Sequence, residues 1–358
     1  MTSIDYLLEF IEHRLESDPN EGLALWAETF DQLFANWEIS SCRRLLRIIK
    51  QSRLDSDARN EVYVIAVSAQ GMLEIKLGNS EEAVSCYKKA LGKFQATDNG
   101  KETQAWLWSN LGNIYYLSGN FNDAGESYSQ AVELYRQIGD EKGWALALSN
   151  LGNIYRDSGK LKEASEYYQL ALGWQQAHRY EENLAITLIN LGTIYQLEGN
   201  WGEAESAYSR ALELLKSIGD FHLQPQVLGN LGTLYLEMNQ LEKAVDLFLR
   251  DLEINQKAED LLSQSQTLNN LAIAYHRQQN TQQALRCYEG SLEIKKEMGD
   301  QQGELSTLIN YSYLLRDVGE NKRLDDTLKY ARVLALSLQD GNQLSRIEEL
   351  ERDLLSPQ

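Results

Sequence analysis

The chain has 358 residues, and its 34 Lys and Arg face 53 Asp and Glu, for a formal net charge of −19. Binding to a phosphate backbone or an anionic membrane requires clustered Lys and Arg, and the sequence has no such cluster. The amino terminus lacks a basic segment followed by an apolar one, and no apolar run reaches about eighteen residues. Nucleic acid and membrane are therefore not expected partners, and we expect a cytoplasmic protein.

Sequence motifs of catalysis and metal binding do not occur. The four histidines are dispersed, neither an HExxH nor a P-loop pattern is found, and no Cys/His spacing suits zinc. Cys42, Cys86 and Cys287 form no CxxC pair, so we expect small packed residues in a reducing compartment. We predict a protein that is not an enzyme and has no metal and no cofactor.

The amino-terminal region shows helical periodicity without a regular repeat. Residues 3–17 predict a first helix, which Asp18-Pro19-Asn20 would end. Residues 21–36 and 39–52 predict a degenerate helical hairpin. We expect residues 1–57 to form an N-terminal helical cap.

A six-residue motif then returns every forty residues. The motif is Asn-Leu-Gly-Asn-Ile-Tyr in its strongest form, and its copies begin at residues 110, 150, 190 and 230, with weaker ones at 270 and 310. A fixed period of this size indicates a stacked array of one supersecondary unit. Downstream of each strong copy, Ala and an aromatic residue stand four apart on one helical face, first at Ala124 and Tyr128. Each unit is therefore predicted to be a helical hairpin.

The repeats predict an array over residues 58–338, followed by a C-terminal capping helix within 339–358. In the first repeat, Gln70 and Glu74 stand where later copies have Leu and Tyr, so its register is left open. The seven predicted units lie near residues 58–98, 103–139, 143–179, 183–219, 223–259, 263–299 and 303–338.

Glycine occupies two kinds of position in these units. Gly119 and Gly139 follow predicted helices, where a left-handed residue ends a helix. Gly112 lies within a helix, where it costs about 0.8–1.0 kcal/mol relative to Ala. Its return at forty-residue spacing therefore needs a packing reason, and close approach of two helices supplies one.

The repeated order Leu111, Gly112, Tyr115, Ala124, Tyr128 resembles the tetratricopeptide repeat, especially the 40-residue form of Pins-type adaptors and kinesin light chains. This resemblance implies an all-α, right-handed α-solenoid (superhelix) of about seven hairpins with helical caps at both ends. Such repeats commonly end in Pro, whereas this chain has only three prolines and carries Gly-Asp or Arg179-Tyr180 at the junctions. The junction angles, and hence the superhelical pitch, are left open.

One Asn in each of the last six units stands on the predicted concave face, two residues before the helix glycine or its equivalent. Asn inside a helix costs about 0.6 kcal/mol relative to Ala, so six of them cost roughly 4 kcal/mol. Their amides could hold the backbone of an extended peptide, as the resemblance implies, or could bond to the neighbouring helix. We call this set the asparagine row: Asn110, Asn150, Asn190, Asn230, Asn270 and Asn310.

Other positions on the same predicted face complete the candidate partner-binding set. We expect a partner segment with an apolar part toward Trp106 and a polar or acidic part toward Arg277 and Arg316. Partial burial of Trp106 and ordinary solvation of the arginines are the alternatives. The remaining members of the set are Asn113, Tyr116, Asn153 and Arg156.

We therefore predict a protein–protein interaction scaffold that binds an extended or helical peptide segment of a partner. The alternative is a sensory or regulatory subunit that binds a small ligand or peptide and gates a separate effector. A further possibility is an accessory that presents substrates to a partner enzyme. The oligomeric state is left open, with a monomer favoured.

Overall fold

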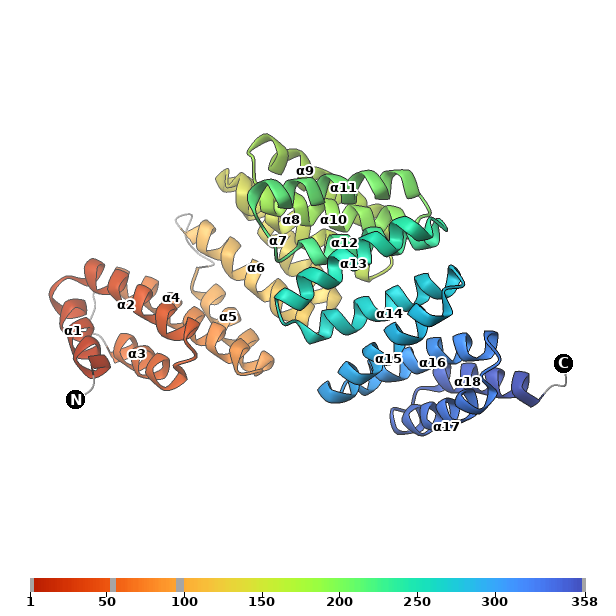
Figure 1. Ribbon diagram of the computed structural model, residues 1–358. Coiled ribbons are helices and arrows are strands. Elements are labelled where there is room, and N and C mark those ends of the chain that lie inside the picture. Colours follow the sequence, from red (N-terminus) through yellow and green to blue (C-terminus); the bar gives the residue numbers. More distant parts are fainter. Residues whose placement is uncertain (1–2, 52–55, 95–99, 356–358) are drawn as a thin grey trace. The chain divides into compact units, whose positions relative to one another are not determined.

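The computed structural model describes residues 3–51, 56–94 and 100–355 (Figure 1). The parts of the predicted caps and first repeat at 1–2, 52–55, 95–98 and 356–358 lie outside these described residues. The described chain forms eighteen α-helices and no strand, which confirms the predicted all-α fold class. The chain divides into two compact units, Met1–Ala177 and His178–Gln358, and each is described by itself.

The first unit starts with three helices that pack together and continues as three hairpins. Within a hairpin, a first and a second helix are joined by a short turn. The helices are α1 (Ser3–Ser17), α2 (Pro19–Ala35), α3 (Ile39–Gln51), α4 (Ser56–Lys76), α5 (Ser80–Phe94), α6 (Lys101–Leu117), α7 (Phe121–Ile138), α8 (Glu141–Asp157) and α9 (Leu161–Ala177).

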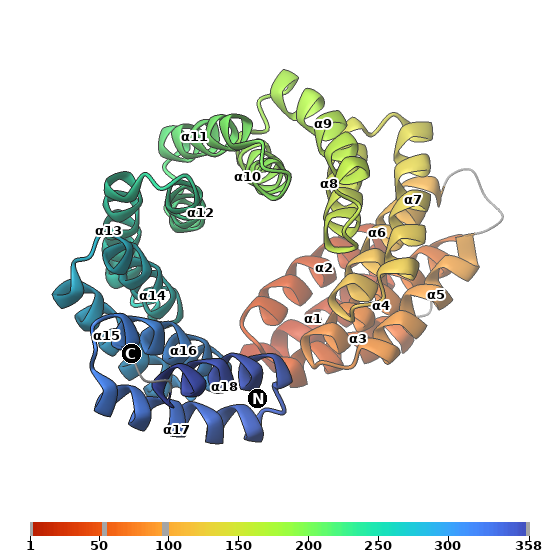
Figure 2. The same cartoon turned by 90° about the vertical axis from the view of Figure 1, so that its right-hand side faces the viewer.

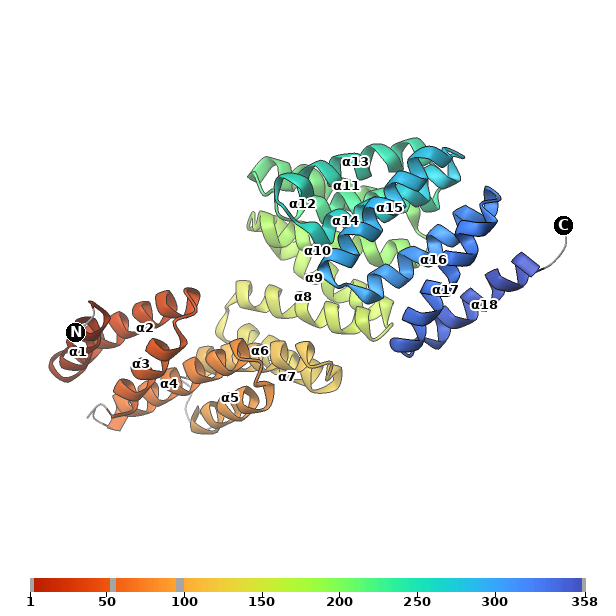
Figure 3. The same ribbon diagram turned by 60° about the horizontal axis from the view of Figure 1, so that its bottom comes forward.

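The second unit holds four hairpins and a final helix. In Figure 2, α10 lies beside α11, and in Figure 3 the last three helices lie together at the carboxyl end. The helices are α10 (Glu181–Leu197), α11 (Trp201–Ile218), α12 (Gln224–Glu237), α13 (Leu241–Lys257), α14 (Leu261–Arg277), α15 (Thr281–Met298), α16 (Gln301–Asp317), α17 (Asn321–Ser337) and α18 (Gly341–Leu355).

Proline sets where two helices begin. The sequence predicted that α2 starts at residue 21, but it starts at Pro19, and Asp18 caps it by accepting a hydrogen bond from the Glu21 N–H. Helix α12 begins at Gln224, with Pro225 in its first turn. Proline is tolerated in the first turn because the N–H it lacks would have no helical partner there.

The glycine inside each first helix lies under an aromatic ring of the second helix. A Cβ added at Gly112 would lie 2.8 Å from Cε1 of Tyr128, and one at Gly152 would lie 2.6 Å from Cε1 of Tyr168. Gly192 faces Tyr208 and Gly232 faces Phe248 in the same way. Packing does require glycine here, but the nearest group is a buried ring of the second helix and not its backbone, as close approach of two helices had suggested.

The same contact settles the register of the first repeat. A Cβ at Gly71 of α4 would lie 2.6 Å from Cε2 of Tyr87 in α5, so this pair is the counterpart of Gly112 and Tyr128. Gln70 and Glu74 therefore take the places that Leu111 and Tyr115 hold in the next hairpin. The first hairpin shares the crossing of the regular repeats although its flanking residues differ.

Most turns use a residue with positive φ, as the glycines predicted. Gly119 and Gly139 have φ of 73° and 76°. Where glycine is absent the conformation persists, because Arg179 and Gln279 have φ of 56° and 60°. A non-glycine residue in this region costs about 1–2 kcal/mol, so these turns are held by the helices on either side.

Three further observations concern the described residues as a whole. Cys42, Cys86 and Cys287 are buried and unpaired, as expected for packed helix residues. None of the described helices combines the length and the apolar character needed to cross a lipid bilayer. No cluster of His, Cys, Asp and Glu side chains within the described ranges could hold a metal ion.

Candidate functional site

The asparagine row lies at the surface of the first helices, on α6, α8, α10, α12, α14 and α16. All six side chains are partly buried, so each retains some contact with solvent. The residue two places along each helix is buried and forms the crossing with the second helix, as Gly112 does for Asn110. Packing at the crossing therefore fixes the direction in which each asparagine points.

Hydrogen bonding divides the row. Asn110 donates from Nδ2 to the Trp106 carbonyl oxygen of its own helix at 2.8 Å, and Asn310 donates to Oδ1 of Asn269 at 3.3 Å. By contrast, no described residue is a hydrogen-bond partner for the side-chain amides of Asn150, Asn230 and Asn270. The fold therefore orients those three amides, but they form no hydrogen bond within the described chain.

Asn113 and Asn153 accept hydrogen bonds from buried tyrosines of their own hairpins. The hydroxyl of Tyr128 donates to Oδ1 of Asn113, and the hydroxyl of Tyr168 donates to Oδ1 of Asn153. Burial raises the pKa of both tyrosines, which keeps the donating hydroxyls protonated. These two asparagines thus have a structural role, and partner binding by them stays a prediction.

Tyr116 and Arg156 meet at one carboxylate that joins two first helices. The hydroxyl of Tyr116 on α6 donates to Oδ2 of Asp157 at 2.6 Å, and Nε of Arg156 donates to Oδ1 at 2.8 Å. Burial would raise the pKa of Asp157, but hydrogen bonds from Arg156 and Tyr116 outweigh it and hold that pKa below its usual value. The arginine charge is therefore offset within the chain.

Arg277 and Arg316, in the second unit, also contact polar groups of the chain itself. Arg277 on α14 donates to the Leu236 carbonyl oxygen of α12 at 2.9 Å. Arg316 pairs with Asp317 of its own helix at 3.0 Å, and the same carboxylate lies 3.1 Å from Nε2 of His276. Both arginines remain exposed, so a partner could still contact them.

Trp106 lies at the start of this face on α6. Its side chain is 39% exposed, and its ring centroid lies 6.1 Å from that of Tyr87 in the preceding hairpin. The ring therefore covers Tyr87 and still presents apolar surface. A role as an apolar contact for a partner stays a prediction.

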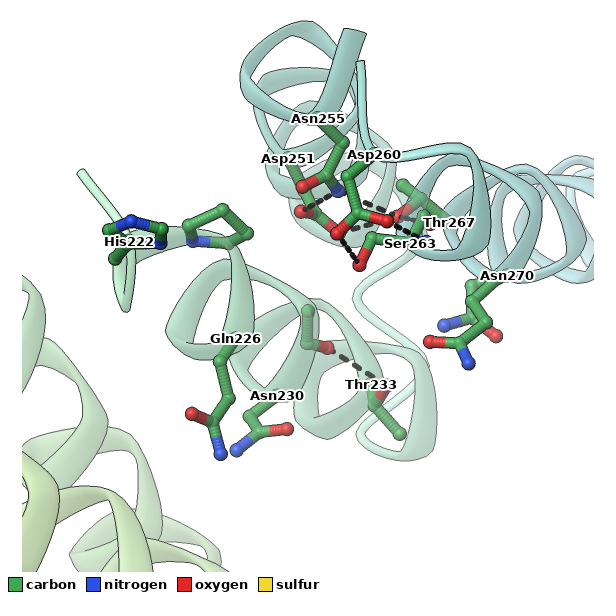
Figure 4. Close-up of a pocket in the computed structure, with 13 residues that line it drawn as sticks. His222, Gln226, Asn230, Thr233, Asp251, Asn255, Asp260, Ser263, Thr267 and Asn270 are labelled. Carbon is green, nitrogen blue, oxygen red and sulfur yellow. Dashed lines mark hydrogen bonds between the residues drawn. The ribbon is translucent and has the colours of Figure 1, made fainter. Parts of the chain in front are cut away.

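A pocket of about 410 Å³ opens between α12, α13 and α14 (Figure 4). Asn230 and Asn270 of the asparagine row line it, together with Gln226 and Gln266 on the first helices. Sequence analysis missed the pocket. The signal was present in the repeat alignment, because residue 251 is Asp where the other regular hairpins have Ala or Ser.

A buried polar group forms the inner wall of this pocket. Asp251 is 5% exposed and accepts hydrogen bonds from Oγ1 of Thr267 at 2.7 Å and from Nδ2 of Asn255 at 2.8 Å. Burial raises the pKa of Asp251 to about 6, against the hydrogen bonds from Thr267 and Asn255, which lower it. Asp260, which caps α14 by accepting from Ser263, is a second carboxylate at the pocket.

Comparisons with known proteins agree with this architecture. The tetratricopeptide repeat profile matches residues 63–137, 103–176, 183–257 and 263–323, which together exceed half of the chain. No curated protein matches the sequence.

Several solved structures share the fold. A STAND (signal transduction ATPase with numerous domains) protein with a tetratricopeptide repeat sensor from Pyrococcus horikoshii is 16% identical, with a TM-score of 0.72 over 98% of this chain and 54% of that one. Aspartyl phosphate phosphatase F from Bacillus subtilis is 13% identical, with a TM-score of 0.63 over 96% and 95% of the two chains. A Rap protein complexed with competence and sporulation factor is 14% identical, with a TM-score of 0.57 over 94% and 99%. These likenesses concern the fold, and the profile match identifies the family: the chain belongs to the tetratricopeptide repeat family.

Proposed function

We propose that this protein is an interaction scaffold that holds an extended segment of a partner protein on the asparagine row. The observation that carries the proposal is the state of Asn150, Asn230 and Asn270. Their amides are partly exposed and have no hydrogen-bond partner among the described residues. An amide offers both a donor and an acceptor, which matches the peptide backbone regardless of its side chains.

Helix propensity argues in the same direction. Each of these asparagines destabilises its helix by about 0.6 kcal/mol relative to Ala. Asn110 and Asn310 offset this cost with internal hydrogen bonds. For Asn150, Asn230 and Asn270 a bound backbone would supply the missing partner. The Rap protein of similar fold is complexed with a factor, which is compatible with ligand binding on such an array.

The test is selection of binders from a random peptide library, followed by affinity measurements on variants. Asn150→Ala and Asn230→Ala should each weaken binding about three- to tenfold, as expected for loss of a neutral hydrogen bond. Their thermal stability should be equal to or higher than that of the parent, because Ala is the better helix former. Asn122→Ala, an exposed position on the second helix α7, is the matched control and should leave affinity unchanged.

Two results would contradict the proposal. A library that yields no binder would remove the scaffold role. Binders that ignore both substitutions would remove the asparagine row from it.

The pocket between α12 and α14 favours a second candidate, a sensor that closes on a small ligand. Its volume of about 410 Å³ falls within the range of small-molecule sites. A sensor should compact on binding, whereas a scaffold should keep its dimensions. Small-angle scattering with and without ligand separates the two, because only the sensor predicts a smaller radius of gyration.

A further inference from the structure

Asp251 stands at a position where the other regular hairpins carry a small residue. In α7, α9, α11 and α17 the equivalent residues are Ala131, Ala171, Ala211 and Ala331, all fully buried against neighbouring helices. In α15 the equivalent is Ser291, which is also fully buried. The repeat therefore provides a buried site for a small residue, and one hairpin places a carboxylate there.

A buried carboxylate normally needs a cation as well as hydrogen bonds. Removing a charge from water costs several kcal/mol, and an opposite charge is the usual compensation. Thr267 and Asn255 donate one hydrogen bond each to Asp251, but no Lys or Arg of the described chain forms an ion pair with it. The hydrogen bonds are supplied by the fold, and a positive charge is not.

The fold also leaves room beside this carboxylate. Gly229 on α12 lies next to it, and a Cβ added there would be 3.6 Å from Oδ2 of Asp251. Every other regular first helix has a side chain at this place: Ser109, Ser149 and Asn269 on three of them, and the buried Ile189 and Ile309 on α10 and α16. Glycine at this place removes the side chain that would otherwise occupy the space, so the pocket reaches Asp251.

The lining of the pocket suits a cation with several hydrogen-bond donors. The described lining residues include two carboxylates, Asp251 and Asp260, and no Lys or Arg. His222 is the one lining side chain in that set that can become positively charged, and it is exposed. Figure 4 shows Asp251, Asn255 and Asp260 on the α13–α14 side, facing His222, Gln226 and Asn230 across the opening.

From this arrangement we infer that the pocket is a cation subsite that takes a guanidinium or primary ammonium group, with Asp251 as its counter-ion. The group would enter between α12 and α14 and donate to the carboxylate, while amide oxygens such as that of Asn230 accept its remaining N–H groups. The cation can belong to a free amine or to an Arg or Lys side chain of a bound segment. The second source rests on the proposed scaffold function, and the first does not.

The test compares charged probes with neutral ones of similar shape by ligand-observed NMR titration. Agmatine and putrescine represent free amines, and N-butylurea is the neutral control. The capped tripeptide acetyl-Gly-Arg-Gly-amide represents a side-chain source, with acetyl-Gly-Gln-Gly-amide as its neutral control. Charged probes should bind at pH 7.5 and low salt, and the neutral probes should bind at least tenfold more weakly.

Two substitutions locate the binding, and both install residues that other hairpins use. Asp251→Ala should weaken the charged probes about ten- to hundredfold, the usual range for a charge-assisted hydrogen bond. Gly229→Ile fills the pocket without altering the carboxylate and should have a similar effect. Asp246→Ala removes the same charge from an exposed position of α13 and should change affinity less than twofold.

The outcomes separate the possibilities. If the Arg tripeptide binds more tightly than agmatine, the source is a side chain, and the reverse order indicates a free amine. Charged probes that bind the parent, Asp251→Ala and Gly229→Ile equally would overturn the inference, and so would their failure to bind the parent. Asn150 does not line this pocket, so Asn150→Ala tests the scaffold proposal without affecting the cation subsite.

Discussion

The junction between α7 and α8 and the junction between α13 and α14 occupy the same place in the repeat but are built differently. The first is apolar, with Ala131, Tyr135 and Ala147 buried together. The second buries Asp251, Asn255 and Thr267 at the places of these three residues. In the hairpins on either side of both junctions, an aromatic ring of the second helix still packs on a glycine or alanine of the first helix. The crossing within a hairpin is thus the feature that these repeats share, and the junctions differ in the residues that they bury.

A second polar junction supports this view. Between α15 and α16, Lys295 is 5% exposed, and its Nζ donates to Oγ1 of Thr307 at 2.6 Å. Burial lowers the pKa of Lys295, as expected for a cation removed from water. Its equivalents in the apolar hairpins are Tyr135 and Leu215. Two consecutive junctions thus bury ionisable groups of opposite charge type, Asp251 between α13 and α14 and Lys295 between α15 and α16.

The largest effect should come from placing the polar residue in the apolar junction. Ala131→Asp buries a carboxylate among Tyr135, Ala147 and Ala105, where Tyr135 and Ala147 take the places of the donors Asn255 and Thr267. We expect a loss of about 3–5 kcal/mol in the free energy of unfolding, the cost of an uncompensated buried charge. Urea denaturation measures it, and a loss below about 1 kcal/mol would show that the two junctions are interchangeable.

The next effect separates the crossing from an exposed position of the same hairpin. Gly152→Ala places a Cβ 2.6 Å from the ring of Tyr168 and should cost about 2 kcal/mol by overpacking. Gly173→Ala on α9 meets nothing within 4 Å and should instead stabilise by about 0.8–1.0 kcal/mol, the gain in helix propensity. The same chemical change should therefore have opposite signs in urea denaturation. Equal signs would refute the packing explanation of the repeated glycine.

The polar junction should also make stability depend on pH. Burial raises the pKa of Asp251 from 3.8 to about 6, while Asp260 and His222 are the other titratable groups at the pocket. Because the folded state binds this proton more tightly than the unfolded state, the contribution of Asp251 to stability rises as pH falls through 6. Between pH 7 and pH 5 the gain should be about 1 kcal/mol relative to Asp251→Asn. Parallel pH profiles for the two proteins would contradict the buried-carboxylate description.

The smallest effect concerns the turns. Gln279 has a φ of 60° where Gly119, Gly159 and Gly199 hold the same turn in other hairpins. Gln279→Gly relieves this conformation, and after the entropy cost of glycine we expect a gain of about 0.5–1 kcal/mol. Gly199→Gln should lose a similar amount. Thermal denaturation of the pair checks the prediction, and two changes of the same sign would refute it.

Sequence periodicity was sufficient for the architecture but not for the pairing of side chains. The forty-residue spacing placed the asparagine row and the glycine positions on the correct helices, because both follow from helical register. It did not reveal that Asn113 accepts a hydrogen bond from Tyr128 or that Tyr116 bonds to Asp157, since these depend on side-chain reach across helices. The start of α2 was wrong because the cap at Asp18 was taken for a helix end.

The pocket could not be predicted from the repeat pattern. Asp251 departs from the Ala or Ser of the other regular hairpins, but its meaning depends on Gly229, which leaves space beside it, and on Thr267 from the next hairpin. Only the folded chain brings these three residues together. A departure from the repeat consensus at a buried position is therefore a useful signal of function in such arrays.

The central claim is that the asparagine row binds a peptide backbone, and an ester scan tests it most directly. Successive backbone amides of a selected peptide are replaced by esters, and the affinity of each analogue is measured for the parent protein and for Asn230→Ala. An ester opposite Asn230 should weaken binding to the parent about three- to tenfold and have little further effect on the variant. If every ester weakens binding to the two proteins equally, the asparagine does not contact the backbone, and the claim is contradicted.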